Sequence, residues 1–303
     1  RPCEIAASTL SPRHRASRHA AHRKQVRDRT AEVRRDVSRK GLTKSAAIIR
    51  CNRIHSRHPH VLTPRFFVAE PLPHTGGTAL TLRGPVAQHM QVLRLATGNG
   101  LALFDGLGGE CEATLVQLGK REAVVEIVAH HAIERESPLS ITLVQALATG
   151  DKMDSIVQKA VELGAMAVQP ISTLRATVKL TAERAAQRQE HWQAVVIAAC
   201  EQCGRNRVPT IHPVLTFERW LSGSAHGQRA LLHPDGGATI QSLQRDAPIE
   251  LAIGPEGGFA SEEIESARRA GCMILTAGPR VLRTETAGMA LLAALNALAG
   301  DLR

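Results

Sequence analysis

The sequence has almost no aromatic residues: among 303 residues there are five Phe, two Trp and no Tyr. Unpaired RNA bases are commonly held by stacking on aromatic rings, and few side chains are available for that here. Long apolar runs are missing too. The last one, at 289–299, is shorter than the ~18 residues of a membrane span and contains Asn296, so it predicts a buried helix.

Cysteine is also sparse, with six residues in the whole chain. This number argues against a disulfide framework and favours a reducing, cytoplasmic location. Cys200 and Cys203 form a CxxC motif, but no second CxxC supplies the further ligands that a metal site needs. We therefore expect no metal, and we expect both cysteines to pack along a helix.

Acidic residues are scarce only near the N-terminus. Of the 38 Lys and Arg residues, 16 lie within 1–63, against four of the 28 Asp and Glu residues. The rest of the chain holds 22 basic and 24 acidic residues. The net charge of +10 is therefore no sign that the body of the protein binds nucleic acid, and any such case must rest on local sites.

Residues 1–63 are rich in Arg, His, Ser and Ala without apolar periodicity, so we expect a basic, disordered extension. An Arg-rich, acid-poor segment is also typical of a transit peptide, and a basic arm that contacts RNA phosphates is another interpretation. A further one is coding sequence upstream of the true start, because patterned sequence begins abruptly at Pro64.

The remaining chain divides by its pattern into two parts. Residues 64–136 contain five short strand-like runs separated by glycine-bearing turns, which predict a small β-barrel. Within 137–303 strand-like runs alternate with helical patterns, which predicts an α/β domain with a parallel sheet covered on both faces. The segment 132–138 is the expected linker, because Pro138 interrupts the pattern.

Capping residues indicate where helices begin and end in the second part. Thr181 and Ser261 are expected N-caps, and Gly164, Gly271 and Gly300 stand where C′ glycines are expected. The expected helices are 151–163, 181–203, 261–270 and the one after Thr286, and the expected strands are 139–147, 167–171, 230–233, 251–254 and 273–276.

The segment GPEGGF at 254–259 lies between a predicted strand and a predicted helix. Ligands of parallel sheets bind beyond the carboxyl ends of the strands, and glycines let the backbone approach a ligand closely. The segment fits neither GxGxxG nor a Walker A loop. By itself it is explained equally well as an ordinary tight turn.

A second polar loop, TAGPRVLRTETAG, occupies 276–288. A turn at Gly278 is followed by Arg280, Arg283 and Glu285. The apolar helix that comes next is expected to be buried, so the loop lies at its mouth. Two interpretations stay open, namely a ligand-binding loop and helix capping with a structural cluster of ion pairs.

Two helices carry the other polar candidates. The long helix ends in ACEQCGRNRVP at 199–209, where Glu201, Arg205 and Arg207 are polar, and arginines can hold a phosphate in bidentate fashion. The amphipathic helix near 151–163 places Lys152 and Lys159 on one polar stripe. That stripe is either a solvated face or a basic ridge that faces a substrate.

Together these segments resemble the RsmE-type 16S ribosomal RNA uridine-N3 methyltransferases of the SPOUT superfamily. The resemblance runs from Pro64 to the C-terminus and excludes the first 63 residues. Each motif is modest alone, but their order and spacing are specific. They are PRFFV at 64–68, HMQVLR at 89–94, DKMDSIVQKAVELGA at 151–165, EQCGR at 201–205, IGPEGGF at 253–259 and GPRVLRTETA at 278–287.

The resemblance implies a PUA-like β-barrel at 64–136 that binds RNA and a SPOUT methyltransferase domain at 137–303 with a C-terminal trefoil knot, an exception to the rule that chains avoid threading. It implies S-adenosyl-L-methionine as the cofactor, a homodimer, and 16S ribosomal RNA within the small ribosomal subunit as the substrate. The cofactor would be bound by Gly254, Pro255, Glu256, Gly257, Gly258, Leu275, Gly278, Arg280, Leu282, Arg283 and Thr284.

The reaction itself requires that uracil N3 lose its proton, so a base or a cation that stabilises the anion is needed. Glu285 and Glu256 are candidates for the base or for a cofactor contact, and Arg205 and Arg283 for stabilising the anion or orienting a phosphate. The expected catalytic group is Arg205, Glu201, Arg283 and Glu285. RNA contacts are expected from Arg65, Arg94, Lys152, Lys159, Arg205 and Arg207.

Two other functions fit the same sequence. A SPOUT methyltransferase with another target, such as a ribose 2′-hydroxyl of transfer RNA, would need a stronger base because that hydroxyl is far less acidic than uracil N3. A non-catalytic RNA-binding factor would use the barrel and leave the pocket idle. The intact pocket motifs argue against the second alternative.

Overall fold

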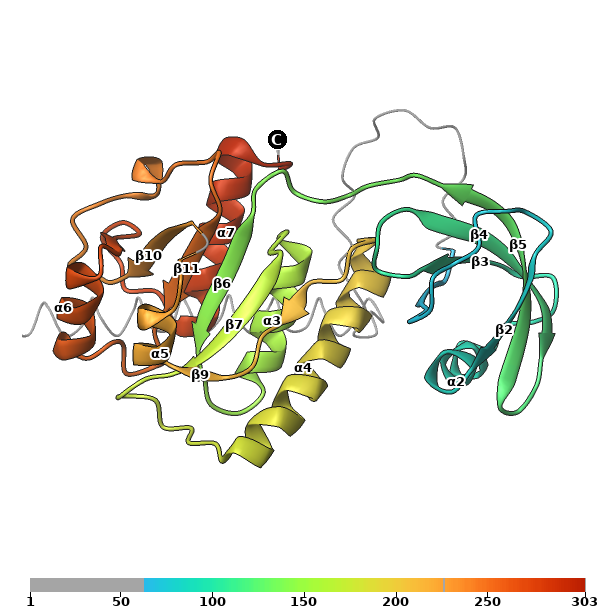
Figure 1. Cartoon of the computed structure of the whole chain (residues 1–303), viewed down its shortest axis with the longest axis horizontal. Helices are drawn as coiled ribbons and strands as arrows, with labels where there is room; N and C mark the ends of the chain where they lie inside the picture. The colour runs from blue at the N-terminus through green and yellow to red at the C-terminus, as the bar shows by residue number, and fades with distance from the viewer. Residues whose placement is uncertain (1–62, 226, 303) are drawn as a thin grey trace, which may run out of the picture. The chain divides into compact units, whose positions relative to one another are not determined.

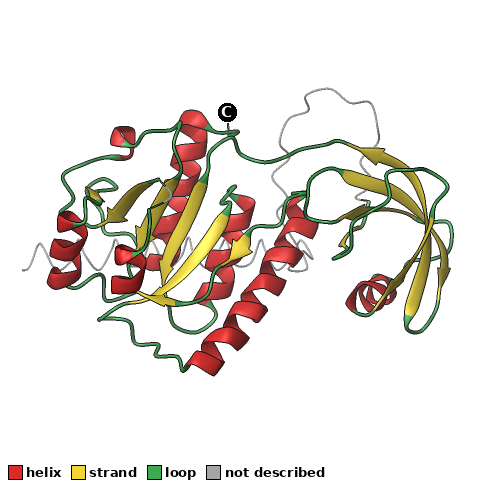
Figure 2. Cartoon of the chain, viewed as in Figure 1, coloured by secondary structure: helices red, strands yellow, loops and turns green. Residues whose placement is uncertain are grey.

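The computed structural model describes residues 63–225 and 227–302, and this part of the chain forms two sheets (Figures 1 and 2). The strands of the first sheet lie within 65–131, and the second sheet begins at Ile141. What the sequence predicted for the basic segment 1–63 lies, apart from residue 63, outside the described residues.

The first sheet has five strands and is curled. Its strands are β1 (Arg65–Phe67), β2 (Ala79–Arg83), β3 (Gly100–Phe104), β4 (Glu110–Leu118) and β5 (Glu122–His131). They lie in the order β1-β3-β4-β5-β2, with β1 parallel to β3 and the other pairs antiparallel. Within the described residues no pairing joins β1 to β2, so the small barrel predicted from the sequence is a curled, half-open sheet.

A helix that the sequence analysis missed, α2 (Pro85–Val92), packs against β2, β4 and β5. Its buried residues Ala87 and Met90 join the apolar core of the curled sheet. Pro85 at its first turn was an available signal, because proline is common where a helix begins. With only eight residues, the helix was too short for its apolar periodicity to distinguish it from the strands around it.

The second sheet has seven strands, all paired in parallel. They are β6 (Ile141–Ala146), β7 (Ala167–Ser172), β8 (Thr210–Ile211), β9 (Leu215–Thr216), β10 (Gln228–Leu232), β11 (Ile249–Ile253) and β12 (Met273–Leu275). Their order is β12-β10-β11-β6-β7-β8, with β9 beside β7. The parallel sheet confirms the α/β prediction, and the trefoil knot stays a prediction.

Helices cover both faces of this sheet, as the alternating pattern predicted (Figure 2). One core contains buried residues of α3 (Lys152–Glu162), α4 (Ala182–Cys203) and α7 (Thr284–Ala299), and a second contains those of α5 (Phe217–Ser222) and α6 (Ser261–Arg269). Cys200 is buried in the first core and Cys203 packs against it, so the helical role predicted for both is confirmed.

The predicted helix ends are mostly confirmed. Thr181 is the N-cap of α4 and accepts a hydrogen bond from the Arg184 amide at 3.4 Å. The prediction for Ser261 is wrong, because Ala260 is the N-cap of α6 and the Glu263 carboxylate takes the capping bond from its amide. Gly164 and Gly271 have positive φ as expected, whereas Gly300 has a φ of −101° and is no left-handed cap.

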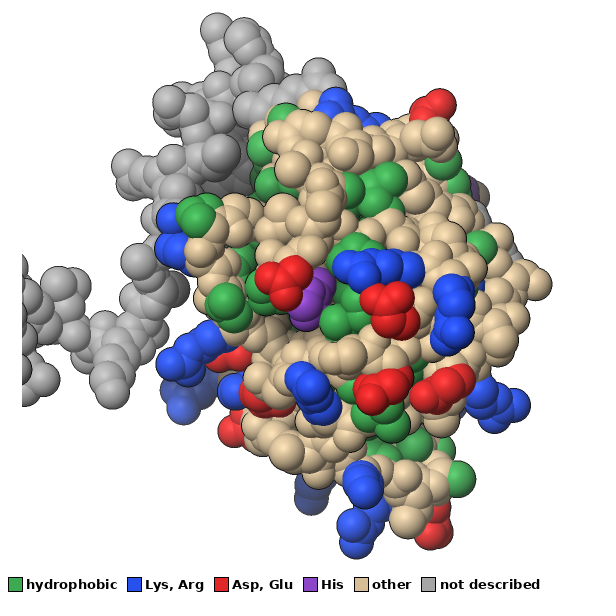
Figure 3. Space-filling view, turned by 90° about the vertical axis from the view of Figure 1, so that its left-hand side faces the viewer, with side chains coloured by type: hydrophobic (Ala, Val, Ile, Leu, Met, Phe, Trp, Pro, Cys, Tyr) green, Lys and Arg blue, Asp and Glu red, His purple; other side chains and the backbone are tan. Residues whose placement is uncertain are grey.

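The surface of the described residues shows two further features. None of their helices is long and apolar enough to cross a membrane. The face seen in Figure 3 mixes Lys and Arg side chains with Asp and Glu side chains instead of presenting one sign. This mixture agrees with the near balance of 22 basic and 24 acidic residues outside the N-terminal segment.

Candidate functional site

A pocket of about 550 Å³ lies where three neighbouring strands of the parallel sheet end. Leu232 and Ile253 are the last residues of β10 and β11, and His233, Gly254 and Thr276 directly follow β10, β11 and β12. Parallel sheets bind ligands at this edge, and a pocket of this size suits a small organic molecule. The loop 254–259 and the loop 276–285 form the two long walls.

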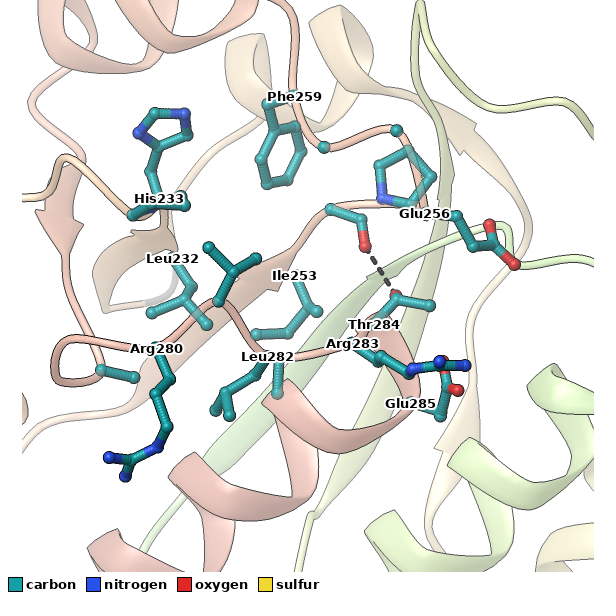
Figure 4. A pocket seen from close by; sticks show the side chains of 18 of the residues that line it. Leu232, His233, Ile253, Glu256, Phe259, Arg280, Leu282, Arg283, Thr284 and Glu285 are labelled. Carbon is teal, nitrogen blue, oxygen red and sulfur yellow. Dashed lines mark hydrogen bonds between the residues drawn. The ribbon is translucent and has the colours of Figure 1, made fainter. Parts of the chain in front are cut away.

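The floor of the pocket is apolar. Leu232, Ile253 and Leu282 line it and gather near the centre of Figure 4, and Phe259 of the loop 254–259 adds an aromatic ring to the lining. Ala277 and Leu282 line the same pocket, and their main-chain amides donate no hydrogen bond to any of the described residues. Apolar surface beside free main-chain amides suits a flat heteroaromatic ring with acceptor nitrogens.

The loop 254–259, called the glycine loop below, has little room for side chains at two of its glycine positions. A Cβ on Gly254 would stand 3.2 Å from the Phe259 ring, and one on Gly257 would stand 3.3 Å from the Arg175 Cβ. Gly258 has a φ of 68°, which side chains rarely adopt, and its amide donates to the Pro255 carbonyl at 2.9 Å. The segment 254–259 therefore contains a tight turn and also forms one wall of the pocket.

A hydrogen bond from one buried hydroxyl connects the wall 276–285 to the wall 254–259. Thr284 Oγ1 donates to the Gly254 carbonyl at 2.6 Å, the dashed line of Figure 4. The same oxygen accepts from Gln145 Nε2 at 3.0 Å. Thr284 is the first residue of α7, so this hydrogen bond holds the N-terminus of α7 directly against the glycine loop.

Acidic and basic side chains meet at the rim. Glu256 Oε1 accepts from the Thr149 amide at 3.0 Å, the Thr149 hydroxyl at 2.6 Å and Lys152 Nζ at 2.9 Å. Partial burial acts to raise the pKa of Glu256, but these hydrogen bonds outweigh it and lower the pKa to about 2. The bond to Glu256 in turn raises the pKa of Lys152.

Glu285 also lies near Lys152 but forms fewer interactions than Glu256. Its Oε2 is 3.7 Å from Lys152 Nζ, which is an ion pair beyond hydrogen-bond distance, and it accepts no hydrogen bond from the described residues. Figure 4 shows Glu285 beside Arg283. The rim thus offers one occupied carboxylate, Glu256, and one with a free oxygen, Glu285.

Two arginines of the rim are also free. Arg280 and Arg283 are exposed, and neither forms a hydrogen bond or ion pair through its guanidinium with any described residue. Figure 4 shows their guanidinium groups on opposite sides of the loop. Unpaired arginines at the mouth of a pocket are suited to a phosphate or to another anion.

The structure brings together nearly all the residues predicted to bind the cofactor. Ten of the eleven line the pocket, and Leu275 does not, because it is fully buried and its carbonyl accepts from the His233 amide. The sequence analysis missed the wall after β10, formed by Leu232, His233 and Pro234. Its signal was the strand predicted at 230–233, but the strand order that puts its end here was not predictable.

Two predicted catalytic residues lie elsewhere. Arg205 is 5% exposed, and its guanidinium donates to the Glu136 carboxylate and to the carbonyls of Val161 and Ala165. Glu201 accepts from the Phe67 amide of β1 at 3.1 Å. Neither lines the pocket, and both connect α4 or its C-terminal loop to other parts of the chain. Four of the five N–H donors of the Arg205 guanidinium are used within the chain, and its burial keeps it from contacting RNA.

The residues predicted to bind RNA are also divided. Arg65 pairs with Glu110 and Asn206, Lys159 pairs with Glu162, and Arg207 pairs with Glu134 on an exposed surface. Lys152 belongs to the pocket rim. Among the six, only Arg94 is both exposed and without a side-chain partner among the described residues.

Comparison with known proteins defines the class. Residues 135–296 match the family model of an RNA methyltransferase domain, and residues 82–128 match that of an RNA methyltransferase PUA domain. The parallel sheet with its pocket therefore corresponds to the methyltransferase domain, and the curled sheet contains the PUA domain. The fold and the site are those of an RNA methyltransferase.

Individual relatives narrow the class to a family. The chain is 35% identical over 216 residues to a ribosomal RNA small subunit methyltransferase E of Synechocystis sp., covering 69% of each chain. It superposes with a TM-score of 0.74 and 37% identity on the enzyme of that name from Neisseria gonorrhoeae bound to S-adenosyl methionine, covering 80% of this chain and 100% of that one. The chain belongs to the ribosomal RNA small subunit methyltransferase E family, which confirms the predicted resemblance.

A second solved structure agrees with this assignment. It is a methyltransferase of Legionella pneumophila in complex with bound SAM, with a TM-score of 0.76, 36% identity and coverage of 80% of this chain and 100% of that one. The cofactor predicted from the sequence is thus the one bound to both of these neighbours. The apolar floor, the free amides and the glycine wall described above fit that molecule.

Proposed function

We propose that the protein transfers a methyl group from S-adenosyl-L-methionine to N3 of a uridine in 16S ribosomal RNA. The observation that carries the proposal is the pocket at the ends of β10, β11 and β12, with an apolar floor and a charged rim, in a chain of this family. The bound cofactor supplies an activated methyl group, so the tasks of the protein are alignment and exclusion of water.

Cofactor binding is assigned to the two walls and the floor. Leu232, Ile253 and Leu282 would contact the adenine ring, and the free amides of Ala277 and Leu282 would donate to its nitrogens. Gly254 and Gly257 leave the space into which a side chain would otherwise project. Leu275 supports this wall from inside the sheet without touching the ligand.

We assign the base to Glu285 and not to Glu256. Glu256 accepts three hydrogen bonds and has a pKa of about 2, so it holds a proton poorly and serves to orient Lys152 and Thr149. Glu285 Oε2 is buried beside Lys152 but accepts no hydrogen bond from the described residues, so this carboxylate is not committed to another donor and would receive the N3 proton after turning toward the bound uracil. Arg283, which is unpaired among the described residues and lies beside Glu285, would stabilise the uracil anion (Figure 4).

RNA contacts are assigned to exposed cations. Arg94 on the PUA side and Arg207 on the exposed surface near the junction would contact phosphates, and Arg280 would do so at the pocket rim. We assign Arg65, Arg205 and Glu201 to holding the curled sheet and α4 in place, because their polar atoms already bind other parts of the chain. Lys159 forms a local ion pair with Glu162 and is given no further role.

The assembly and the location belong to the same proposal. We infer a homodimer, for which Leu298 of α7 offers apolar surface that is 44% exposed. We further infer that the substrate is 16S ribosomal RNA within the small ribosomal subunit and that the enzyme works in the cytoplasm. Light scattering of the purified full chain tests the dimer, since a mass of one subunit would contradict it.

Methyl transfer to isolated small ribosomal subunits tests the proposed reaction. With S-adenosyl-L-methionine the protein is expected to produce one N3-methyluridine in 16S ribosomal RNA, located by mass spectrometry of RNA fragments. Glu285→Gln should lower kcat by about a hundredfold or more, since positioned bases contribute about 10² to 10⁴, and should leave cofactor affinity nearly unchanged.

The outcomes separate the alternatives. A methyl group on a ribose 2′-hydroxyl, or on another RNA, would replace the proposed target. Cofactor binding without any methylation of subunits, free ribosomal RNA or transfer RNA would favour an RNA-binding factor. Full activity of Glu285→Gln would overturn the assignment of the base.

A further inference from the structure

A buried glutamine lies beneath the pocket without lining it. Gln145 is near the carboxyl end of β6, is 0% exposed, and stands opposite Ile253 of β11, the residue before the glycine loop. Glutamine inside a central strand is costly unless its amide is hydrogen-bonded. The two surrounding strands are otherwise rich in apolar residues, so the polar side chain here needs an explanation.

The contacts of Gln145 form a directed chain. Its Nε2 donates to the Ala146 carbonyl at 3.0 Å and to Thr284 Oγ1 at 3.0 Å. Because the Thr284 hydroxyl donates its single proton to the Gly254 carbonyl at 2.6 Å, it can only accept from Gln145. The amide group therefore stands with its nitrogen toward Thr284, and Oε1 is left without a partner among the described residues.

This chain joins the three segments that make the site. It starts on β6, passes through the first residue of α7, and ends on the first residue of the glycine loop. Arg283 and Glu285 flank Thr284, so fixing Thr284 also fixes the two rim residues assigned to the reaction (Figure 4). Hydrogen bonds in series polarise one another in a buried setting, which strengthens the whole chain.

We propose that Gln145 is a positioning residue of the methyltransferase site, which acts through Thr284 to hold the two pocket walls at the separation that the cofactor requires. The inference rests on the proposed function only for the measurement of cofactor affinity. The alignment of the two walls is a property of the protein alone, and amide hydrogen exchange measures it without any ligand.

The experiment compares Gln145→Met and Thr284→Val, which remove the two donors with little change of volume, with Thr284→Ser, which keeps the hydroxyl. The matched control is Gln169→Met, because Gln169 is a buried glutamine of the neighbouring strand β7 whose Nε2 donates to the carbonyls of Pro170 and Pro213. Cofactor affinity by calorimetry, KM and kcat, Tm, and hydrogen exchange of the Gly258 and Ala287 amides are measured on the full chain.

Gln145→Met and Thr284→Val are each expected to weaken cofactor affinity by about tenfold, to raise KM for the cofactor more than they lower kcat, and to speed exchange of both amides. The double variant should be little worse than either single one, because both break one chain of bonds. Gln169→Met should keep the affinity of the unmodified protein, and Thr284→Ser, which keeps the hydroxyl, should restore most of the affinity that Thr284→Val loses.

Three results would overturn the proposal: unchanged affinity and exchange in Gln145→Met, losses that multiply in the double variant, or an equal loss of affinity in Gln169→Met. Thr284→Val tests the same hydrogen bond from its other end if Gln145→Met does not fold. The two proposals can also fail separately. If the unmodified protein binds no cofactor but the variants still show faster amide exchange, the proposed function is refuted and the positioning role of Gln145 is supported.

Discussion

The role that a charged residue can have in this chain depends more on its hydrogen-bond partners than on its residue type. Glu256 and Glu285 both lie on the rim of one pocket. Glu256 accepts three hydrogen bonds, whereas Oε2 of Glu285 accepts none from the described residues. Arg205 and Arg283 show the same contrast among cations, because Arg205 is buried against Glu136 whereas Arg283 is exposed and unpaired within the described part of the chain. Sequence motifs identified all four and could not separate them.

Arg94 is a residue whose conformation is unfavourable for its type. It has a φ of 54° at the end of α2, where its amide donates to the Gln91 carbonyl and the Leu95 amide donates to the Met90 carbonyl. This is the Schellman arrangement, which usually has glycine at that position. Arg94→Gly should therefore raise the free energy of unfolding by about 0.5 to 1 kcal/mol, measured by urea denaturation.

The same substitution should weaken RNA binding. Loss of one phosphate contact is expected to reduce the slope of log affinity against log salt by about 1, measured by fluorescence anisotropy with a 16S ribosomal RNA fragment. Arg94→Lys serves as the control, since it keeps both the charge and the backbone strain. A less stable Arg94→Gly protein, or one that binds RNA as before, would contradict this account.

Elements were more predictable than the contacts between them. Each strand and helix expected in the second domain is present, because period and capping are local properties that the sequence records directly. Short elements were missed: α2 and α5 are too brief for a periodic signal, and β8 and β9 have two residues each. Thr181 was found as a cap because its side chain acts locally, whereas the cap of α6 uses Glu263 and not Ser261.

A contact between elements, at Glu110 of β4, gives a prediction on pH. Burial acts to raise the pKa of Glu110, but hydrogen bonds from Arg135 and Arg65 outweigh it and lower the pKa from 4.5 to about 2. A lowered folded-state pKa adds stability that is present above pH 4.5 and is lost as pH falls toward about 2. Glu110→Gln should thus lower stability at neutral pH and flatten its fall in that acidic range.

Urea denaturation at a series of pH values measures this effect. The matched control is Glu122→Gln, because Glu122 pairs with Arg83 through side chains that are 54% and 77% exposed, and exposed pairs contribute little. Equal acid dependence in Glu110→Gln and the unmodified protein would show that the Arg65–Glu110–Arg135 cluster does not stabilise the fold.

For the molecule as a whole, the sequence predicted which loops form the pocket but not the wall between them. The glycine loop (254–259) follows β11, and the arginine loop (276–285), which contains Arg280 and Arg283, follows β12. Both strands are neighbours of β10 because of the strand order, which is a non-local property. His233 and Leu232 therefore went unnoticed, and Gln145 did too, because its role depends on a hydroxyl 139 residues away in the chain. Conversely, Arg205 lies in a motif of the family but holds α4 to the linker and α3.

The central claim is that the glycine loop and the arginine loop together hold S-adenosyl-L-methionine. Calorimetric titration of the cofactor into the full chain and into Gly257→Val tests it most directly, since a Cβ at residue 257 already stands 3.3 Å from Arg175 and the valine methyls must extend farther. The account predicts binding to the unmodified chain, a loss of at least about tenfold in Gly257→Val, and a variant that still unfolds cooperatively, with a Tm lowered by the crowding at Arg175. No binding to the unmodified chain, or equal affinity of the two proteins, would contradict it.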